Sequence, residues 1–119
     1  MKLSYRGFLN TKHSWSLVGS KLMLAMKDLG HEIVMESTNG TDSIDERIRP
    51  YLGATDPNST CITYTIPINL AKFQARNKVE IYNYETTVLP AGWADMLNRY
   101  ADLILPSSSF QKRIFEKNG

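Results

Sequence analysis

Apolar and polar positions along the chain alternate between the two-residue repeat of a β-strand and the three-to-four-residue repeat of an α-helix. Leu3 and Tyr5 begin a strand that we place at residues 2–9. From residue 15 the apolar positions follow helical spacing and share one face: Val18, Leu22, Ala25, Met26 and Leu29. Gly30 provides the left-handed backbone that ends such a helix. The chain therefore opens with a strand and a helix.

A second strand at residues 31–36 completes a β-α-β unit of about thirty residues, whose two strands are expected to be parallel. The following segment, residues 37–60, is polar. Within it Ser43 to Glu46 resembles a capping box, which predicts a short helix that ends before Pro50.

Three further strands are expected at residues 61–66, 78–84 and 102–106, and residues 67–77 have room for a single helical turn. Pro90 suits the first turn of another helix. Strands that alternate with helices predict an α/β fold with a Rossmann-like parallel sheet of about five strands and helices on both faces.

The strand order fixes where a ligand would bind. We expect the order 3-2-1-4-5, in which the connections change direction between the first and the fourth strand. Ligands of open α/β sheets bind at the carboxyl ends of the strands that flank such a switch point. Loops at residues 10–16, 84–89 and 106–109 are then expected to meet at one site.

The last third of the chain carries the most specific motif. Residues 82–93 read Tyr-Asn-Tyr-Glu-Thr-Thr-Val-Leu-Pro-Ala-Gly-Trp, and residues 102–107 read Asp-Leu-Ile-Leu-Pro-Ser. An aromatic–Glu pair, a Pro-x-x-Trp helix start and an Asp-x-(aliphatic)-x-Pro-Ser strand end come in this order in many retaining glycosyltransferases of the GT-B fold, family 4 above all. The chain resembles their acceptor-side, N-terminal domain, most specifically over residues 82–119.

This resemblance implies that residues 1–119 are one Rossmann-like N-terminal domain, half of a GT-B fold. The parent enzyme would be a hexosyltransferase that moves a sugar from a nucleotide-sugar donor to a sugar, lipid or protein acceptor. In this family the donor binds mainly to a C-terminal domain, which this sequence does not contain. Without that domain nothing stabilises the leaving diphosphate, so residues 1–119 alone are expected to be inactive. The resemblance implies no cofactor besides the donor substrate.

Glu85 is the strongest candidate for substrate binding, because a carboxylate at a buried strand end must be hydrogen-bonded or functional. A carboxylate accepts two hydrogen bonds from a vicinal diol of a sugar. Tyr84 beside it is a platform for a sugar face, and Ser107 and Ser108 offer hydroxyls and backbone N–H groups at a helix start. The structural alternative is that Glu85 only ties its loop to backbone amides or to the serine turn.

The loop after the first strand is the second candidate region. It holds no glycine before Gly19, so the dinucleotide fingerprint is absent and an NAD enzyme is disfavoured. Ser14 and Trp15 begin a helix whose N–H groups suit a hydroxyl-rich or anionic group, and His13 can carry a proton or contact a phosphate. The structural alternatives are that Ser14 only caps the helix, that Trp15 only packs against the sheet, and that His13 is a solvated loop residue. No residue is assigned a catalytic role.

The composition of the chain limits the kinds of partner that it is expected to bind. Lys and Arg number 14 against 12 Asp and Glu, and no basic stripe occurs, so nucleic acid is not an expected partner. Cys61 is alone and the two histidines lack neighbouring ligands, so neither a disulfide nor a metal site is expected.

The N-terminus lacks the apolar region of a signal peptide and no apolar run reaches membrane-spanning length, which predicts a cytoplasmic protein. A peripheral membrane contact stays open. The alternative function is a stand-alone small α/β binding or regulatory module, although no predicted strand ends in the Asp that a phosphoacceptor module needs.

Overall fold

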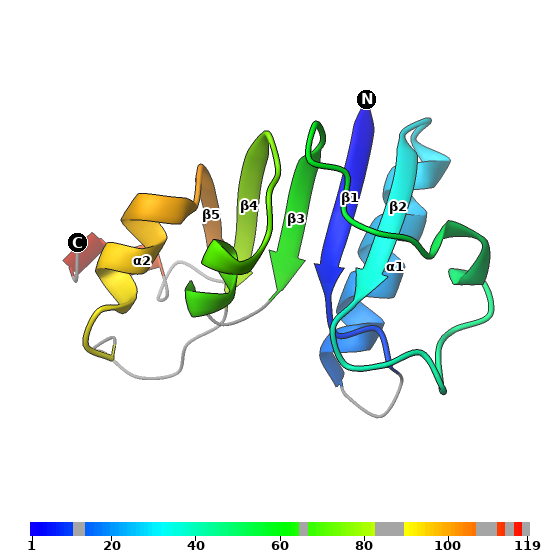
Figure 1. Cartoon of the computed structure of the whole chain (residues 1–119), viewed down its shortest axis with the longest axis horizontal. Coiled ribbons are helices and arrows are strands. Elements are labelled where there is room, and N and C mark those ends of the chain that lie inside the picture. Colours follow the sequence, from blue (N-terminus) through cyan, green and yellow to red (C-terminus); the bar gives the residue numbers. More distant parts are fainter. Residues whose placement is uncertain (11–13, 65–66, 83–89, 107–111, 114–115, 118–119) are drawn as a thin grey trace.

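The computed structural model of the chain describes residues 1–10, 14–64, 67–82, 90–106, 112–113 and 116–117. Five strands form one parallel sheet: β1 (Lys2–Gly7), β2 (Glu32–Ser37), β3 (Thr60–Tyr64), β4 (Asn77–Tyr82) and β5 (Leu103–Pro106). The helices are α1 (Ser14–Asp28) and α2 (Trp93–Tyr100), with short 3-10 helices η1 (Arg49–Tyr51) and η2 (Pro67–Lys72). The fold is Rossmann-like α/β, as the sequence predicts (Figure 1).

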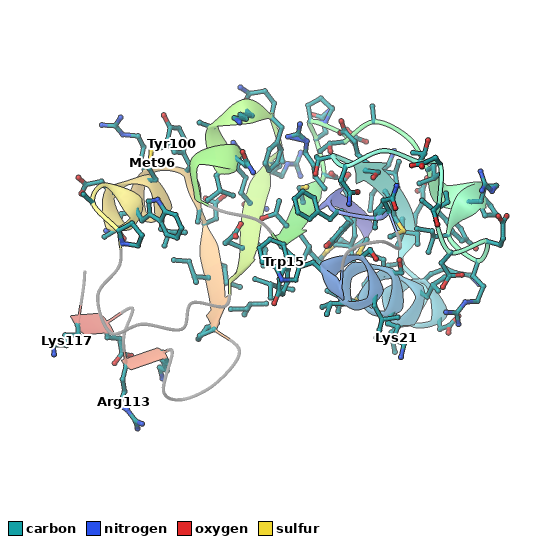
Figure 2. All side chains as sticks on the ribbon, turned by 90° about the horizontal axis from the view of Figure 1, so that it is seen from below. Trp15, Lys21, Met96, Tyr100, Arg113 and Lys117 are labelled. Carbon is teal, nitrogen blue, oxygen red and sulfur yellow. The ribbon has the colours of Figure 1, made fainter. Side chains whose placement is uncertain are left out.

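Helical segments lie on both sides of the sheet. Helix α1 covers one face behind β1 and β2, whereas η2 and α2 lie on the opposite side, over the half of the sheet formed by β3 to β5 (Figures 1 and 2). The side changes because the connection from β1 to β2 through α1 and the connection from β3 to β4 through η2 run in opposite directions across the sheet, and parallel crossovers share one handedness. Among the described residues, no helix is long and apolar enough to cross a membrane.

The observed strand order is β2-β1-β3-β4-β5, so the predicted order 3-2-1-4-5 is wrong. The third strand lies beside β1 and separates it from β4. Beyond β2, where the prediction placed the third strand, only a single parallel bridge joins Met35 to Leu52, with the Gly53 N–H donating to the Met35 carbonyl at 2.9 Å. The segment that reaches this edge is polar and interrupted by Pro50 and Gly53, so it touches β2 without extending the sheet.

Helix α1 buries only part of the face that its apolar spacing predicts. Leu22 and Met26 pack against the core, but Val18 and Leu29 are exposed. The buried positions are the small residues Ser16, Gly19 and Ser20 together with Met23. The reason lies in the sheet. Tyr5 of β1 is fully buried, and its ring fills the space directly beneath Gly19. Because the large side chain in this contact comes from the sheet, the helix needs small residues there.

Two helix starts also differ from the prediction. The short α-helix expected after residue 43 is not formed by residues 44–48, where Asp45 accepts hydrogen bonds from Arg47 and Glu46 pairs with Arg49 at 2.8 Å. Pro50 lies inside η1 and does not end a preceding helix.

Helix α2 starts at Trp93, after Gly92 has adopted a left-handed φ of 84°, and Pro90 precedes it. Residues 112–113 and 116–117 of the last predicted helix are helical.

Candidate functional site

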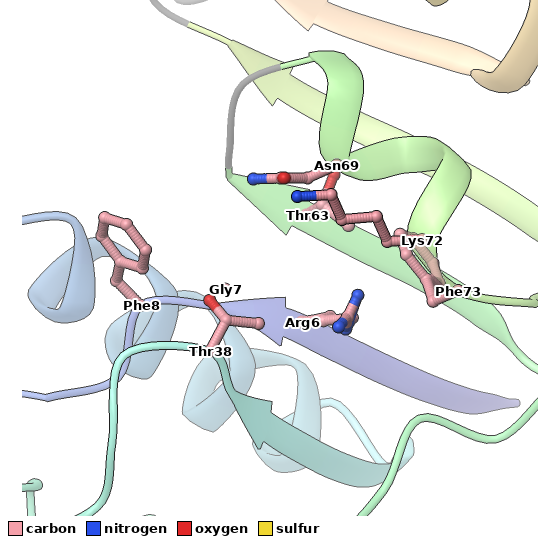
Figure 3. Close-up of a pocket in the computed structure, with 8 residues that line it drawn as sticks. All are labelled: Arg6, Gly7, Phe8, Thr38, Thr63, Asn69, Lys72 and Phe73. Carbon is pink, nitrogen blue, oxygen red and sulfur yellow. The ribbon is translucent and has the colours of Figure 1, made fainter.

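A pocket of about 270 Å³ opens where the carboxyl ends of the central strands meet η2. Figure 3 shows its lining, which comes from β1 and the residue after it, from the residue after β2, from β3, and from η2 and the residue after it: Arg6, Gly7, Phe8, Thr38, Thr63, Asn69, Lys72 and Phe73. The connections change sides of the sheet between β1 and β3, so the pocket lies at the switch point, the usual ligand position in an open α/β sheet.

A row of four polar side chains crosses the sheet beneath this pocket. The strand register pairs Arg6 with Glu36 on β2 and with Thr63 on β3, and pairs Thr63 with Glu80 on β4. Residues in register project from the same face of a parallel sheet. We call Glu36, Arg6, Thr63 and Glu80 the polar row. It replaces the apolar surface that normally faces the covering helices of such a sheet.

Arg6 is the pocket cation that comes from the sheet. Its Nε lies 3.7 Å from Oε1 of Glu36, which is an ion pair but is too long for a hydrogen bond. This Nε is a buried atom with no hydrogen-bond partner among the described residues. The guanidinium carbon lies 5.1 Å from the centre of the Phe73 ring, a cation–π distance. Arg6 is thus held in position while part of its donor capacity remains unused.

Two lysines add to the positive charge around Phe73. Lys72 ends η2, is exposed, and lines the pocket. Lys78 lies below it, with its Nζ 4.5 Å from the centre of the Phe73 ring, and donates a hydrogen bond to the Leu70 carbonyl. Burial lowers the pKa of Lys78, since removal from water disfavours its charged form.

The two carboxyl groups of the polar row are already engaged. Oε1 of Glu36 accepts hydrogen bonds from the backbone N–H of Thr55 at 2.9 Å and from its hydroxyl at 2.7 Å. Burial acts to raise the pKa of Glu36, but the Thr55 bonds and Arg6 outweigh it, so that the pKa lies below its usual value. Glu80 is fully buried and accepts a hydrogen bond from the Thr63 hydroxyl.

Asn39 fixes the start of the loop that follows β1. Its Oδ1 accepts hydrogen bonds from the backbone N–H groups of Leu9 at 3.0 Å and Asn10 at 2.9 Å, and from the Ser37 hydroxyl at 3.0 Å. One side-chain oxygen therefore joins the ends of β1 and β2 next to the pocket.

We expect Asn39→Ala to lower the free energy of unfolding by about 1 kcal/mol, because two partly buried N–H groups lose their acceptor. Urea denaturation followed by circular dichroism measures this change. Asn39→Asp keeps an acceptor at the same place and is expected to remain within about 0.5 kcal/mol of the unchanged chain. Equal losses in both variants would contradict the role assigned to Oδ1.

Of the residues singled out from the sequence, Trp15 is the one whose side chain the structure describes. Its ring stacks on Phe8 at a centroid distance of 5.6 Å and meets Tyr64 edge-on at 4.9 Å. Trp15 thus borders the pocket through Phe8, which lines it. Ser14 is the first residue of α1, but its side chain is outside the described part of the chain. The other candidates lie outside the described residues: His13, Tyr84, Glu85, Ser107 and Ser108.

The observed strand order places the switch point between β1 and β3. The neighbours of the switch point are the segments after β1 and β3, whereas the prediction paired the loop after the first strand with loops after the fourth and fifth. Sequence reasoning consequently missed Arg6, Thr63 and Lys72. One signal was available for Arg6, since it is a charged residue within a short strand whose neighbours on both sides are buried.

Neither family models, nor curated proteins, nor solved structures match this chain. The function therefore has to be inferred from the motif resemblance and from the geometry of the pocket. Within the described ranges, no group of three or more His, Cys, Asp or Glu side chains is arranged to hold a metal ion.

A second, wider hollow of about 850 Å³ lies along α2. Its lining comes entirely from residues 91–99, that is, from one helix and the turn before it. Ligand sites usually bring polar groups together from several elements. The pocket at the switch point does so, and this makes it the better candidate.

Proposed function

We propose that this chain is the acceptor-side domain of a retaining glycosyltransferase, and that the switch-point pocket holds part of the sugar acceptor. The observation that carries the proposal is the lining of the pocket, where hydroxyl, amide and cationic groups from four segments converge between two aromatic rings. The first glycosyltransferase-like motif begins at the end of β4 and the second runs through β5, and both strands end at the same carboxyl edge of the sheet.

The chemistry of the lining suits a polyhydroxylated ligand. Thr38, Thr63 and Asn69 present groups that both donate and accept hydrogen bonds, as sugar hydroxyls do. The Thr63 hydroxyl donates to Glu80, so its oxygen lone pairs remain suited to a ligand donor. Phe8 and Phe73 offer apolar surface for the C–H face of a sugar ring. Glu85, which follows β4, is proposed to bind a vicinal diol.

The donor half of the reaction needs groups beyond this pocket. Departure of a nucleoside diphosphate develops negative charge that cations or N–H dipoles must stabilise. We propose that a donor-binding domain supplies them, as in the glycosyltransferases that this chain resembles. Residues 1–119 alone are therefore expected to give no sugar transfer from nucleotide-sugar donors. Turnover by this chain in a product assay would overturn the assignment of donor binding to a second domain.

Titration of the ¹⁵N-labelled chain with glucose, UDP-glucose and NAD tests the binding role. Glucose is expected to shift the amide signals of Phe8, Thr63 and Phe73, and UDP-glucose to add no nucleotide-dependent shifts. Glu85→Gln is expected to weaken sugar binding, while Glu116→Gln, at an exposed position, leaves it unchanged. Binding of NAD without any response to sugars would overturn the proposal.

The alternative, a stand-alone binding module, is favoured by one observation. The lining of the pocket lies entirely between residues 6 and 73 and needs no motif from the last third of the chain. The intact mass of the natural gene product separates the two functions. A mass about three times the 13.5 kDa of this chain favours the enzyme, whereas a mass near 13.5 kDa favours the binding module.

A further inference from the structure

We propose that the switch-point pocket recognises a phosphate group on its small-molecule ligand, with Arg6 and Lys72 as the phosphate-binding residues. The two cations reach the pocket from different elements, Arg6 from β1 and Lys72 from the end of η2, as Figure 3 shows. None of the lining residues carries a carboxylate. The lining therefore carries a positive charge, which a ligand that offers only sugar hydroxyls does not require.

The positive charge around the pocket is only partly compensated by nearby carboxylates. Glu36 pairs with Arg6 at 3.7 Å, but its Oε1 is also the acceptor for both Thr55 donors. Glu80 lies beside Thr63 on the neighbouring strand and is fully buried. Against these stand Arg6 and Lys72, together with the nearby Lys78, whose charge also interacts with Asp102. Lys72 makes no ion pair with a described residue, so its charge remains available to a ligand.

Arg6 has donors to spare. Its Nε–H is buried without a hydrogen-bond partner among the described residues, and a buried donor of this kind destabilises the protein unless something accepts from it. A phosphate oxygen would satisfy it, since guanidinium groups bind phosphates through parallel N–H bonds. The contact with Phe73 keeps the guanidinium plane in place before the ligand arrives.

The donor set favours a phosphate over a carboxylate. Guanidinium and ammonium donors reach the pocket from β1 and η2, and the Thr38 hydroxyl adds a donor from the residue after β2, so the ligand meets donors from several directions. A phosphate monoester accepts from several directions, through three oxygens at nearly two negative charges, whereas a carboxylate accepts in one plane. The pocket volume of about 270 Å³ leaves room for the rest of a small phosphorylated molecule against Phe8.

This inference names the ligand class of the same pocket, and it rests on the proposed function only in that the phosphorylated molecule would be the acceptor. Phosphate binding itself does not depend on sugar transfer. The two are tested separately, because the phosphate probes need neither a nucleotide-sugar donor nor a second domain.

The test compares the dissociation constants of inorganic phosphate, glucose 6-phosphate, glucuronate and glucose, measured by amide chemical shifts at constant ionic strength. Glucose 6-phosphate is expected to bind at least about tenfold more tightly than glucose, and more tightly than glucuronate. Arg6→Gln is expected to weaken its binding about tenfold, and the exposed Lys72→Gln about threefold.

Two further variants separate a phosphate site from general charge attraction. Glu36→Gln keeps the acceptor for Thr55 but removes the negative charge that competes for Arg6, so phosphate binding is expected to tighten about threefold. Lys21→Gln, on the exposed side of α1, removes a positive charge far from the pocket and is expected to change nothing (Figure 2).

The outcomes are distinct. Equal affinity for glucose and glucose 6-phosphate would overturn the phosphate site and leave the proposed sugar binding intact. Phosphate binding that responds to Lys72→Gln and Glu36→Gln, without any response to glucose, would support the phosphate site and count against the sugar acceptor. If Lys21→Gln and Lys72→Gln weaken binding equally, the attraction is non-specific and the site is wrong. The affinity of Arg6→Gln is interpreted only if its amide spectrum keeps the pattern of the folded chain. If it does not, Lys72→Gln replaces it as the test variant.

Discussion

Gly19→Ala is expected to lower the free energy of unfolding by about 1–3 kcal/mol, through overpacking of a rigid core contact. A methyl group at this position would lie 2.4 Å from both the hydroxyl oxygen and Cζ of Tyr5. Tyr5 is fully buried and is covered by α1, so its ring has no free space into which it can move. Elsewhere in a helix the same substitution stabilises by up to about 1 kcal/mol. The sign of the effect is therefore diagnostic.

Thermal and urea denaturation of the two chains measure this change. Lys21→Ala, two positions later on the exposed side of α1, is the matched control and is expected to stay within about 0.5 kcal/mol. Tyr5→Leu combined with Gly19→Ala is expected to be less destabilised than the sum of the single variants, since the smaller side chain makes room for the methyl group. A Gly19→Ala chain as stable as the original would show that α1 does not pack on Tyr5 as described.

The same contact explains why the sequence predicts α1 but only part of its buried face. Periodicity identifies a helix from the spacing of its large apolar residues, and Val18 and Leu29 satisfy the spacing while remaining exposed. What buries this helix is complementarity, in which a large residue of β1 meets small residues of α1. A pattern of apolar positions within one segment carries no information about the size of the side chain opposite.

The strand order shows a related limit. All five strands were found within a few residues of their bounds, because each is short, apolar and bordered by turn residues. Their neighbours depend on where polar residues 37–59 run, and a connection of this kind has no periodicity. The order of β1 and β3 decides which loops border the pocket, so a correct list of strands did not locate this pocket.

The candidate site was visible in the sequence only in part. Arg6 and Glu80 are charged residues inside strands that are otherwise suited to burial, and each is a signal for a paired or functional group. Lys72 gives no such signal, since it lies in a segment without a clear pattern. Its place in the pocket follows from the 3-10 turn of η2, which the sequence does not specify.

The hydrogen bond between Thr63 and Glu80 is the second contact whose loss should have a large effect. Glu80 has no exposed surface, and Thr63 is equally buried beside it on β3. We expect Thr63→Val to lower the free energy of unfolding by about 1–3 kcal/mol, because the isosteric side chain leaves a buried oxygen of Glu80 without this donor. Thr60→Val, on the same strand but at a partly exposed position, is the control and is expected to cost less than about 0.5 kcal/mol.

A double-mutant cycle separates the bond from the packing of either side chain. If the two residues stabilise the fold through their hydrogen bond, Glu80→Leu and Thr63→Val together should destabilise by about 0.5–3 kcal/mol less than the sum of the single variants. The reason is that each single variant removes one partner of this bond and leaves the other without it, whereas the double variant removes both. Strict additivity would mean that the bond contributes nothing. Any loss of stability in Thr63→Val would then come from the packing of its side chain and not from its hydrogen bond to Glu80.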